Sequence, residues 1–191
     1  MNLFSLLAEG FDLPILDWIA SNLWCPFLDA VMPVITVLGD AGIFWMVLAG
    51  VLLLFKKTRR VGLGMGVAML MGLLLCNLTL KPLCQRPRPY DYQYETFGKL
   101  IPLLIQRQHD FSFPSGHTIA SFEAAGVIAL NNKKWGAAAL VLASLIAFSR
   151  LYLYVHYPTD VLVSVVLGVA FAFLGNRIAH RAPDRYLLLN K

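Results

Sequence analysis

The sequence predicts an all-α, polytopic membrane protein: a bundle of six transmembrane helices forming a single domain over residues 1–191. Three observations predict this fold. The chain of 191 residues is 58% hydrophobic and only 14% charged, whereas a soluble domain carries about 25% charged residues. Its apolar runs approach the ~20 residues that an α-helix needs to cross a bilayer. No Gly-rich, Ser-rich or charged linker divides the chain.

The first half of the chain is expected to contain a short interfacial helix and three spans. Residues 1–14 have no Lys or Arg and no small-residue cleavage site, so we expect an interfacial N-terminal helix rather than a signal peptide. The first span, 15–38, contains Asp17, Asp29 and Pro33, so part of it should face other helices. A turn is expected at 39–40. The second span, 41–55, ends at the basic segment 56–60, and the third span occupies 61–80. Four glycines in the third span suit close helix packing.

The second half is expected to contain one long polar segment and three more spans. Residues 81–113 are rich in proline and tyrosine, and long loops in compact proteins are commonly functional. The apolar stretch 100–105 suggests a short interfacial piece, so we expect a partly helical loop between spans three and four. The last three spans are expected at 117–130, 135–153 and 158–178, followed by a polar, basic tail at 180–191.

The distribution of basic residues predicts how this bundle is oriented. Lys and Arg collect on the cytoplasmic side of membrane proteins. With the N-terminus in the cytoplasm, ten of the sixteen Lys and Arg residues fall on that side, in 56–60, 131–134 and 177–191. The other six face outward, and three of them, Lys81, Arg88 and Arg150, are expected to belong to the site described next. The sequence therefore predicts a plasma or inner membrane protein whose net charge of +5 reflects this orientation rather than nucleic-acid binding.

Three polar clusters are expected on the outer face of the membrane. They are Lys81–Pro89 after the third span, Pro114–His117 before the fourth, and Ser149–Asp160 across the turn between the fifth and sixth. Because successive spans alternate in direction, the three clusters should reach the same membrane surface. Ionisable groups at a membrane boundary are functional candidates by default. Three cations, two histidines and one carboxylate together favour a multiply charged anion, of which phosphate is the commonest.

The residue types in these clusters suit a phosphate group. Arg88 and Arg150 each offer a planar fork to phosphate oxygens, and Lys81 adds a compact charge. Ser115 and Gly116 open a helix, where unpaired backbone N–H groups attract anions, and Gly116 permits close approach of the backbone. Fixed donors of this kind stabilise the negative equatorial oxygens of a pentavalent transition state.

Two histidines complete the predicted chemistry. His156 and Asp160 are four residues apart at the start of the sixth span, so the carboxylate can hold one ring nitrogen protonated and leave the other free to attack. His156 is therefore the predicted nucleophile, and His117 the predicted acid for the leaving oxygen. A helix N-terminus disfavours a protonated His117, and we expect a bound phosphate dianion to offset this effect.

Together the three clusters match a family signature. The motifs Lys81-x6-Arg88-Pro89, Pro114-Ser115-Gly116-His117 and Ser149-Arg150-x5-His156-x3-Asp160 resemble the tripartite signature of the type 2 phosphatidic acid phosphatase superfamily. The resemblance implies a helical-bundle membrane phosphatase that needs no metal or other cofactor and works through a phosphohistidine. It implies His156 as nucleophile, Asp160 as its partner and His117 as acid, with Lys81, Arg88, Ser115, Gly116 and Arg150 binding phosphate.

The expected partner is a phosphorylated lipid whose tail enters sideways between the helices. The short chain looks like the undecaprenyl diphosphate and phosphatidylglycerophosphate phosphatases. We therefore expect undecaprenyl diphosphate as the first candidate substrate, and phosphatidylglycerophosphate or phosphatidate as the second.

Other interpretations of the same residues stay open at this point. A non-catalytic transporter or binder of phosphorylated lipids would use the same cations, although it would not need the histidines. A zinc site at His117, His156 and Asp160 would have to tolerate the adjacent cations. Asp110 is interpreted as part of a solvated loop. Glu123 lies inside the fourth span and needs a partner or a polar cavity.

Overall fold

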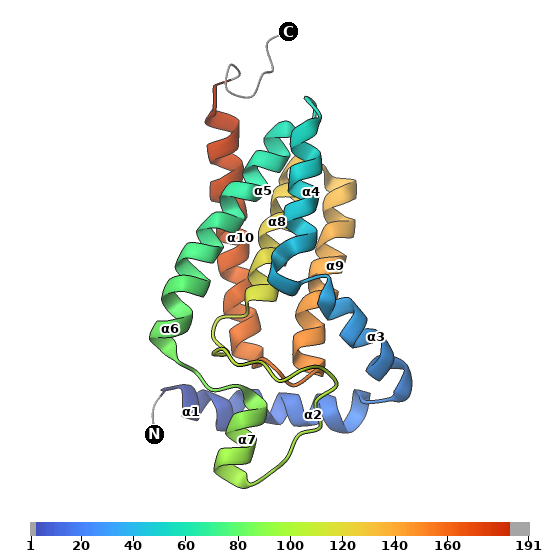
Figure 1. Cartoon of the computed structure of the whole chain (residues 1–191), viewed down its shortest axis with the longest axis vertical. Coiled ribbons are helices and arrows are strands. Elements are labelled where there is room, and N and C mark those ends of the chain that lie inside the picture. The colour runs from blue at the N-terminus through green and yellow to red at the C-terminus, as the bar shows by residue number, and fades with distance from the viewer. Residues whose placement is uncertain (1–2, 184–191) are drawn as a thin grey trace.

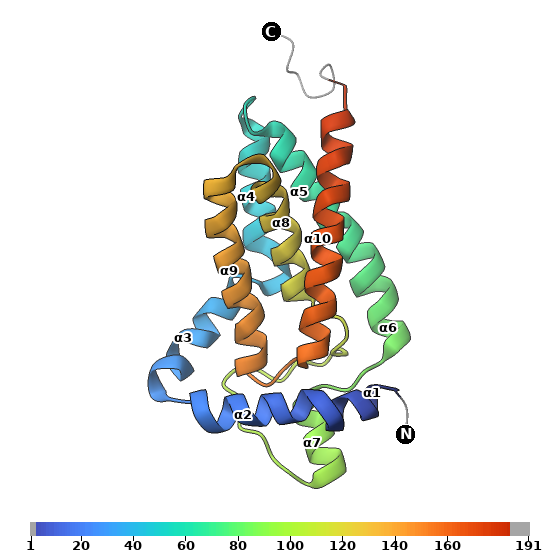
Figure 2. The ribbon, with the colours of Figure 1, turned by 180° about the vertical axis from the view of Figure 1, so that it is seen from behind.

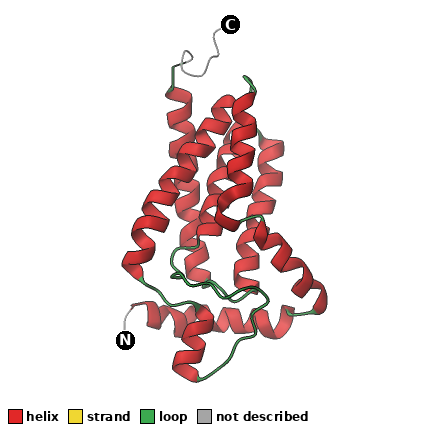
Figure 3. Cartoon of the chain, viewed as in Figure 1, coloured by secondary structure: helices red, strands yellow, loops and turns green. Residues whose placement is uncertain are grey.

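Helices make up the regular structure of the chain. The computed structural model describes residues 3–183, and within that range it contains helices and loops but no strand (Figure 3). The all-α prediction is therefore confirmed. In chain order the elements are α1 (Leu3–Leu7), η1 (Ala8–Asp12), α2 (Leu13–Leu23), α3 (Pro26–Val37), η2 (Asp40–Gly42), α4 (Ile43–Leu54), α5 (Arg59–Gly72), η3 (Leu73–Leu80), α6 (Lys81–Cys84), α7 (Pro89–Phe97), α8 (Gly116–Asn131), α9 (Lys133–Tyr152) and α10 (Pro158–Arg181).

The bundle consists of α4, α5, α8, α9 and α10, which run along the long axis of the molecule (Figures 1 and 2). α8 packs against each of the other four. Small residues allow the helices to approach closely: Gly136 of α9 lies against Ala129 of α8, and Gly175 of α10 lies against the backbone of Gly64 on α5. Contacts of this kind, rather than hydrophobic exclusion from water, associate helices inside a membrane.

The N-terminal helices lie across one end of this bundle instead of running along it (Figure 2). α1, η1 and α2 follow one another there, and α3 then rises toward α4. The break has a local cause, because Pro26 begins α3 and a proline forces the preceding residue into an extended conformation. Cys25 accordingly has φ −156° and ψ 156°. The first predicted span, 15–38, is therefore wrong as one helix: it comprises parts of two helices with different directions.

A second break separates α3 from α4. The short 3-10 turn η2 contains Ala41 with φ 48° and Gly42 with φ 67°, both left-handed conformations. α3 and α4 together form one apolar segment, Pro26–Leu54, which is 29 residues long. The N-terminal helix α1 and the end of α10 consequently lie at opposite ends of the bundle (Figure 1), whereas six complete crossings would bring them to the same end.

Four segments of the described chain are long and apolar enough to cross a membrane, which makes this a multi-pass membrane protein. They are Pro26–Leu54, Arg59–Phe97, Lys133–Tyr152 and Pro158–Arg181. The predicted count of six is not confirmed. The second half of its first span, 26–38, and all of its second span except residue 55 fall in Pro26–Leu54. Its fourth span corresponds to α8, which has only 16 residues.

The two ends of the bundle carry different chemistry. The basic turn between α4 and α5, the α8–α9 turn and the end of α10 lie at one end (Figure 1). At the other end lie α6, α7, the loop 98–115 and the turn 153–157 between α9 and α10. α7 confirms that the long polar segment is partly helical, whereas its apolar piece at 100–105 is not helical. All three predicted clusters therefore reach the same end.

Candidate active site

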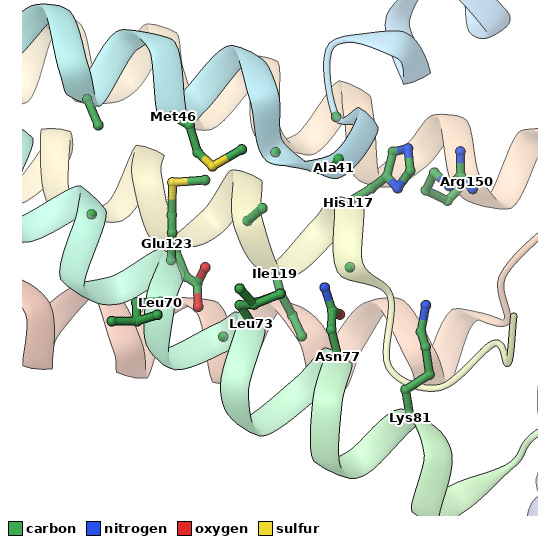
Figure 4. Close-up of a pocket in the computed structure, with 18 of the residues that line it drawn as sticks. Ala41, Met46, Leu70, Leu73, Asn77, Lys81, His117, Ile119, Glu123 and Arg150 are labelled. Carbon is green, nitrogen blue, oxygen red and sulfur yellow. The ribbon is translucent and has the colours of Figure 1, made fainter.

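The three clusters meet at one end of a single cavity of about 690 Å³. Lys81 comes from the start of α6, Arg88 from the residue before α7, His117 from the first turn of α8, Arg150 from α9 and His156 from the α9–α10 turn. All five side chains line the cavity. Figure 4 shows Lys81, His117 and Arg150 gathered at the same end of it. The sequence prediction that these clusters share one face is confirmed.

His156 occupies a tight, buried turn. The chain leaves α9, passes through Tyr154 with φ 57°, and directs the N–H groups of Val155 and His156 back to the carbonyl of Arg150. His156 is 1% exposed. Its Nε2 lies 3.1 Å from Nη1 of Arg88. Because an arginine can only donate, this nitrogen accepts, so it carries the free electron pair that a nucleophile needs.

The other ring nitrogen of His156 faces Asp160. Nδ1 lies 3.5 Å from Oδ2 of that carboxylate and has no hydrogen-bond partner among the described residues. The predicted pair is thus adjacent, although the two atoms stand slightly beyond hydrogen-bond distance. Burial, followed by the charges of Arg88, Arg150 and Lys81, lowers the pKa of His156 well below its usual value. The imidazole is therefore neutral in the free protein.

Asp160 is fixed by a network that the sequence analysis missed. Ser112 Oγ donates to its Oδ2 at 2.6 Å, the backbone N–H of Tyr157 donates at 3.0 Å, and Arg86 Nη1 donates to Oδ1 at 2.5 Å. Arg86 also pairs with Asp12 at 2.6 Å and stacks 3.7 Å above the Tyr157 ring. Arg86 therefore holds in place the carboxylate that was predicted to pair with His156. The sequence around Arg86 shows only that it lies two residues before Arg88. This position does not indicate that its side chain contacts Asp160.

Lys81 and Arg88 share a carboxylate in this structure. Lys81 Nζ lies 2.5 Å from Oδ2 of Asp110, and Arg88 Nη2 lies 2.5 Å from its Oδ1. Burial alone would raise the pKa of Asp110, but the hydrogen bond and charge of Lys81 and the charge of Arg88 lower it below its usual range. Asp110 does lie in a solvated loop, as predicted, with 51% of its side chain exposed, but its pairing with both cations was not predicted. Its ionised carboxylate binds both cations, where an anion is expected.

Arg150 is a buried cation without an ion-pair partner among the described residues. It is 1% exposed, its Nη1 donates to Thr36 Oγ1 at 2.5 Å, and its Nε has no partner among the described residues. Within residues 3–183 no carboxylate lies within ion-pair distance of Arg150. A buried, unpaired charge is costly, so this side chain indicates an anionic ligand from outside the chain.

His117 pairs with a carboxylate that the sequence analysis also missed. Its Nε2 lies 2.7 Å from Oδ1 of Asp40, in the η2 turn between α3 and α4. The left-handed residues Ala41 and Gly42 turn the chain there, and a side chain at Gly39 would lie 2.7 Å from the His117 ring. The sequence predicted a turn at 39–40 but not its contact, which joins residues 77 positions apart. Since the carboxylate takes Nε2, only Nδ1 of His117 is left for the substrate.

The start of α8 is arranged around Ser115 and Gly116. Ser115 is completely buried; its backbone N–H donates to Ser164 Oγ at 2.9 Å, and its hydroxyl accepts from Thr118 at 3.0 Å. Gly116 lines the cavity beside Asn77, whereas Ser115 is not one of the lining residues. The structure thus brings Gly116 to the predicted phosphate site and places Ser115 behind it.

Residues 3–183 contain no group of three or more His, Cys, Asp or Glu side chains arranged to hold a metal ion. His117 instead pairs with Asp40, and His156 faces an arginine. The zinc alternative therefore has no ligand set in this part of the chain.

Comparisons with known proteins agree with this geometry. The family model described as the PAP2 superfamily matches residues 61–184. The undecaprenyl-diphosphatase of Sulfolobus acidocaldarius is 29% identical over 140 residues, which cover 73% of this chain and 65% of that protein, so the chain spans just under two-thirds of its length. Phosphatidylglycerophosphatase B of Bacillus subtilis is 33% identical over 162 residues, covering 78% and 74% of the two chains. The crystal structure of Aquifex aeolicus LpxE superposes with a TM-score of 0.74 at 27% identity, covering 87% of this chain and 94% of that chain.

Proposed function

The chain belongs to the PAP2 superfamily, and we propose that it is a membrane lipid phosphatase that removes a phosphate group from a lipid headgroup through a phosphohistidine on His156. The observation that carries this proposal is the buried Arg150, which has no carboxylate partner among the described residues and lines the same cavity as His156. With Lys81 and Arg88 it forms a set of donors suited to the oxygens of a phosphate.

Two successive displacements at phosphorus give the reaction. In the first, Nε2 of His156 forms a bond to phosphorus while the bond to the lipid oxygen breaks, and that oxygen takes a proton from Nδ1 of His117. In the second, His117 accepts a proton from water, whose oxygen attacks phosphorus and releases His156 together with phosphate. Asp160 stabilises the positive charge that the His156 ring gains in the first step, and the three cations stabilise the equatorial oxygens.

Asp40 is the positioning residue of the acid in this mechanism. Protonated His117 sits at the N-terminus of α8 and near three cations, both of which disfavour its charge. The Asp40 carboxylate, 2.7 Å away, supplies the missing counter-charge and fixes the ring so that Nδ1 is the nitrogen available to the leaving oxygen. This contact provides in the free protein what the sequence analysis expected from a bound phosphate.

Asp110 takes the place of the substrate in the free protein. Its carboxylate binds Lys81 and Arg88 through the same donors that a phosphate requires. Asp110 is 51% exposed and lies in the loop 98–115, so it can leave the cations without disturbing the bundle. We expect the phosphate to replace it when the substrate binds.

The proposed topology places the site at the extracytoplasmic face. Basic turns lie at the opposite end of the bundle from the cavity cations (Figure 1), and such residues favour the cytoplasm. α8 is surrounded by the other bundle helices, so its 16 residues cross the membrane within protein rather than lipid. The chain then crosses five times, through α3–α4, α5–α6, α8, α9 and α10. In this topology its N-terminal helices lie on the outer surface, which replaces the prediction of a cytoplasmic N-terminus.

Two lipid classes are candidate substrates. Undecaprenyl diphosphate is the first, because the Sulfolobus acidocaldarius relative is named an undecaprenyl-diphosphatase. Glycerophospholipids with a terminal phosphate, such as phosphatidylglycerophosphate or phosphatidate, are the second, because the Bacillus subtilis relative is named a phosphatidylglycerophosphatase. A non-catalytic transporter is the rival class, but two histidines with separate carboxylate partners serve proton and phosphoryl transfer better than binding alone.

Phosphate release in detergent tests this proposal. The wild-type protein is incubated with chelator and a panel of polyprenyl and glycerolipid phosphates, beside His156→Ala. The matched control is His180→Ala, because His180 is exposed at the far end of α10 and contacts only the carbonyl of Asn176 in the described chain. We expect release by the wild type and the control and none by His156→Ala. Phosphate release by His156→Ala at the wild-type rate, or no release from any lipid by the wild type, would contradict the proposal.

A further inference from the structure

The cavity continues from the cations into an apolar region between α4, α5 and α8. Beyond His117 its walls are formed by residues such as Met46, Ala49, Leu70 and Leu73. Figure 4 shows Met46, Leu70 and Leu73 in the part of the cavity away from Lys81 and Arg150. One cavity thus joins a site for a charged headgroup to a lining suited to a lipid tail. It gives the atoms that follow the headgroup a defined path along α8.

One ionisable side chain interrupts the apolar region. Glu123 of α8 is 1% exposed, lines the cavity, and has an Oε1 atom without a hydrogen-bond partner among the described residues. The carboxyl group lies against Gly72 of α5. Within residues 3–183 no Lys, Arg or His lies within ion-pair distance of Glu123. A carboxyl group buried without a cation favours its neutral form, which donates one hydrogen bond and accepts others.

The neighbouring helix is shaped to accommodate this carboxyl group. Gly72 lies directly opposite it on α5, and a methyl group at Gly72 would overlap with Oε1. The chain thus makes room for a polar group that it does not fully satisfy. An ionisable residue inside a membrane protein is costly and is a functional candidate for that reason, and an unsatisfied buried group gains most from a ligand that completes its hydrogen bonds.

We propose that Glu123 binds the ester region of a glycerolipid phosphate, by donating a hydrogen bond to an ester carbonyl of the lipid. Glu123 lies six positions beyond His117 on α8, which at ~1.5 Å per residue is about 9 Å from the phosphate end. The ester carbonyls of a diacylglycerol phosphate lie within that reach of the phosphorus. A polyprenyl tail is pure hydrocarbon at the same depth and leaves Oε1 unsatisfied.

The inference rests on the proposed function and decides between its two substrate classes. A site built to hydrogen-bond a substrate discriminates against an analogue without the bonding group more strongly than an apolar wall discriminates between hydrocarbon chains. Glu123 therefore selects glycerolipid phosphates over polyprenyl phosphates, although the headgroup site accepts the phosphate of either.

The test compares three soluble substrates on one preparation. They are dioctanoyl phosphatidate, its dialkyl ether analogue without carbonyl groups, and a short-chain polyprenyl diphosphate. In the wild type we expect kcat/KM for the diacyl lipid to exceed that for the ether lipid by about 3- to 10-fold, the effect of one hydrogen bond. Glu123→Leu should abolish this ratio, and Glu123→Gln, which keeps a donor, should retain most of it. Met46→Leu, another change in the cavity wall, is the control and should leave the ratio unchanged.

The ratio of two kcat/KM values measured on one preparation does not depend on how much of the protein is folded. If Glu123→Leu does not fold, Gly72→Ala takes its place, because the added methyl group displaces the carboxyl. A wild type that treats diacyl and dialkyl lipids alike, or that cleaves only the polyprenyl diphosphate, overturns the inference while the lipid phosphatase proposal stands. If the wild type cleaves none of the three lipids, the proposed function itself is contradicted.

Discussion

The two histidines of the site are held in opposite ways. His156 is fixed in the closed corner between α9 and α10, where Asp160 is held in turn by Arg86 and Asp12 in the protein interior. His117 instead depends on Asp40, a 55% exposed residue on the turn that interrupts the α3–α4 segment. The proposed nucleophile is thus built into the bundle, whereas the proposed acid is completed by a separate, partly solvated element. We therefore expect substitutions on the side of His156 to lower activity far more than substitutions on the side of His117.

The largest expected effect is on the side of His156. His156→Ala should lower kcat by at least about 10⁴-fold, as removal of a nucleophile does in other covalent mechanisms. The measurement is single-turnover phosphate release from a saturating lipid substrate, with thermal unfolding in detergent to confirm the fold. If kcat falls by less than about 100-fold, water attacks phosphorus directly and His156 only helps to bind the substrate.

On the other side of the comparison, His117→Ala should lower kcat by about 10³-fold, within the range for a lost general acid. The loss should shrink when the leaving group needs no proton, because an activated phenyl phosphate departs without acid assistance. The measurement is the ratio of the mutant's losses on a lipid and on p-nitrophenyl phosphate. Equal losses on both substrates would show that His117 acts in phosphate binding rather than as an acid.

Asp40→Asn sharpens the contrast between the two carboxylates. We expect a loss of about 10-fold in kcat, because water screens an exposed carboxylate and reduces its contribution. The protonated form of His117 also loses its counter-charge, so the alkaline limb of the pH–rate profile should move to lower pH. Asp91→Asn is the control, since Asp91 pairs with Arg107 away from the cavity. An unchanged pH–rate profile would show that Asp40 stabilises the turn but does not affect the protonation of His117.

A smaller effect is expected from Asp110→Asn. The carboxylate that competes with the substrate for Lys81 and Arg88 is then neutral, so the KM should fall by about 3-fold with little change in kcat. Inhibition by inorganic phosphate should strengthen by a similar factor. A higher KM would instead identify Asp110 as part of the substrate site.

The pH dependence of the wild type tests the environment of His156 without a mutation. Burial and the surrounding cations lower its pKa, and the neutral ring is the reactive form. Its activity is therefore retained as the pH falls through the ordinary histidine value of about 6.5, and is lost only below it. The acid limb of kcat/KM, which reports the free enzyme, should have its midpoint below that value. A midpoint above it would contradict the buried, cation-surrounded position of His156.

Much of the site could be predicted from the sequence because its residues lie in three local motifs. Arg88, His117, Arg150 and His156 were each recognised by neighbours within a few positions, and the charge pattern predicted that they meet at one end. Their partners were not recognisable, because Asp40 and Arg86 act across separations of 77 and 74 residues. Nothing in the sequence around an aspartate indicates which distant side chain it will contact.

The limits of the fold prediction have a similar origin. Hydrophobic runs correctly indicated a helical membrane protein, but hydropathy does not distinguish a helix that crosses the bilayer from one that lies across the end of a bundle. Because of the two breaks at Cys25–Pro26 and Asp40–Gly42, the residues of two predicted spans form one bent segment and one helix across the end of the bundle. The second break lies where a turn was predicted, but the chain bends there within one apolar segment and places Asp40 beside His117.

The central claim is that His156 carries the phosphoryl group. Its most direct test is rapid acid-free quenching of the enzyme with a lipid labelled in its terminal phosphate, followed by digestion and identification of the labelled peptide. The account predicts label on the peptide containing His156, stable in base and released in acid, and absent from His156→Ala. Label on another residue, or multiple turnovers with no labelled protein at any time point, would contradict it.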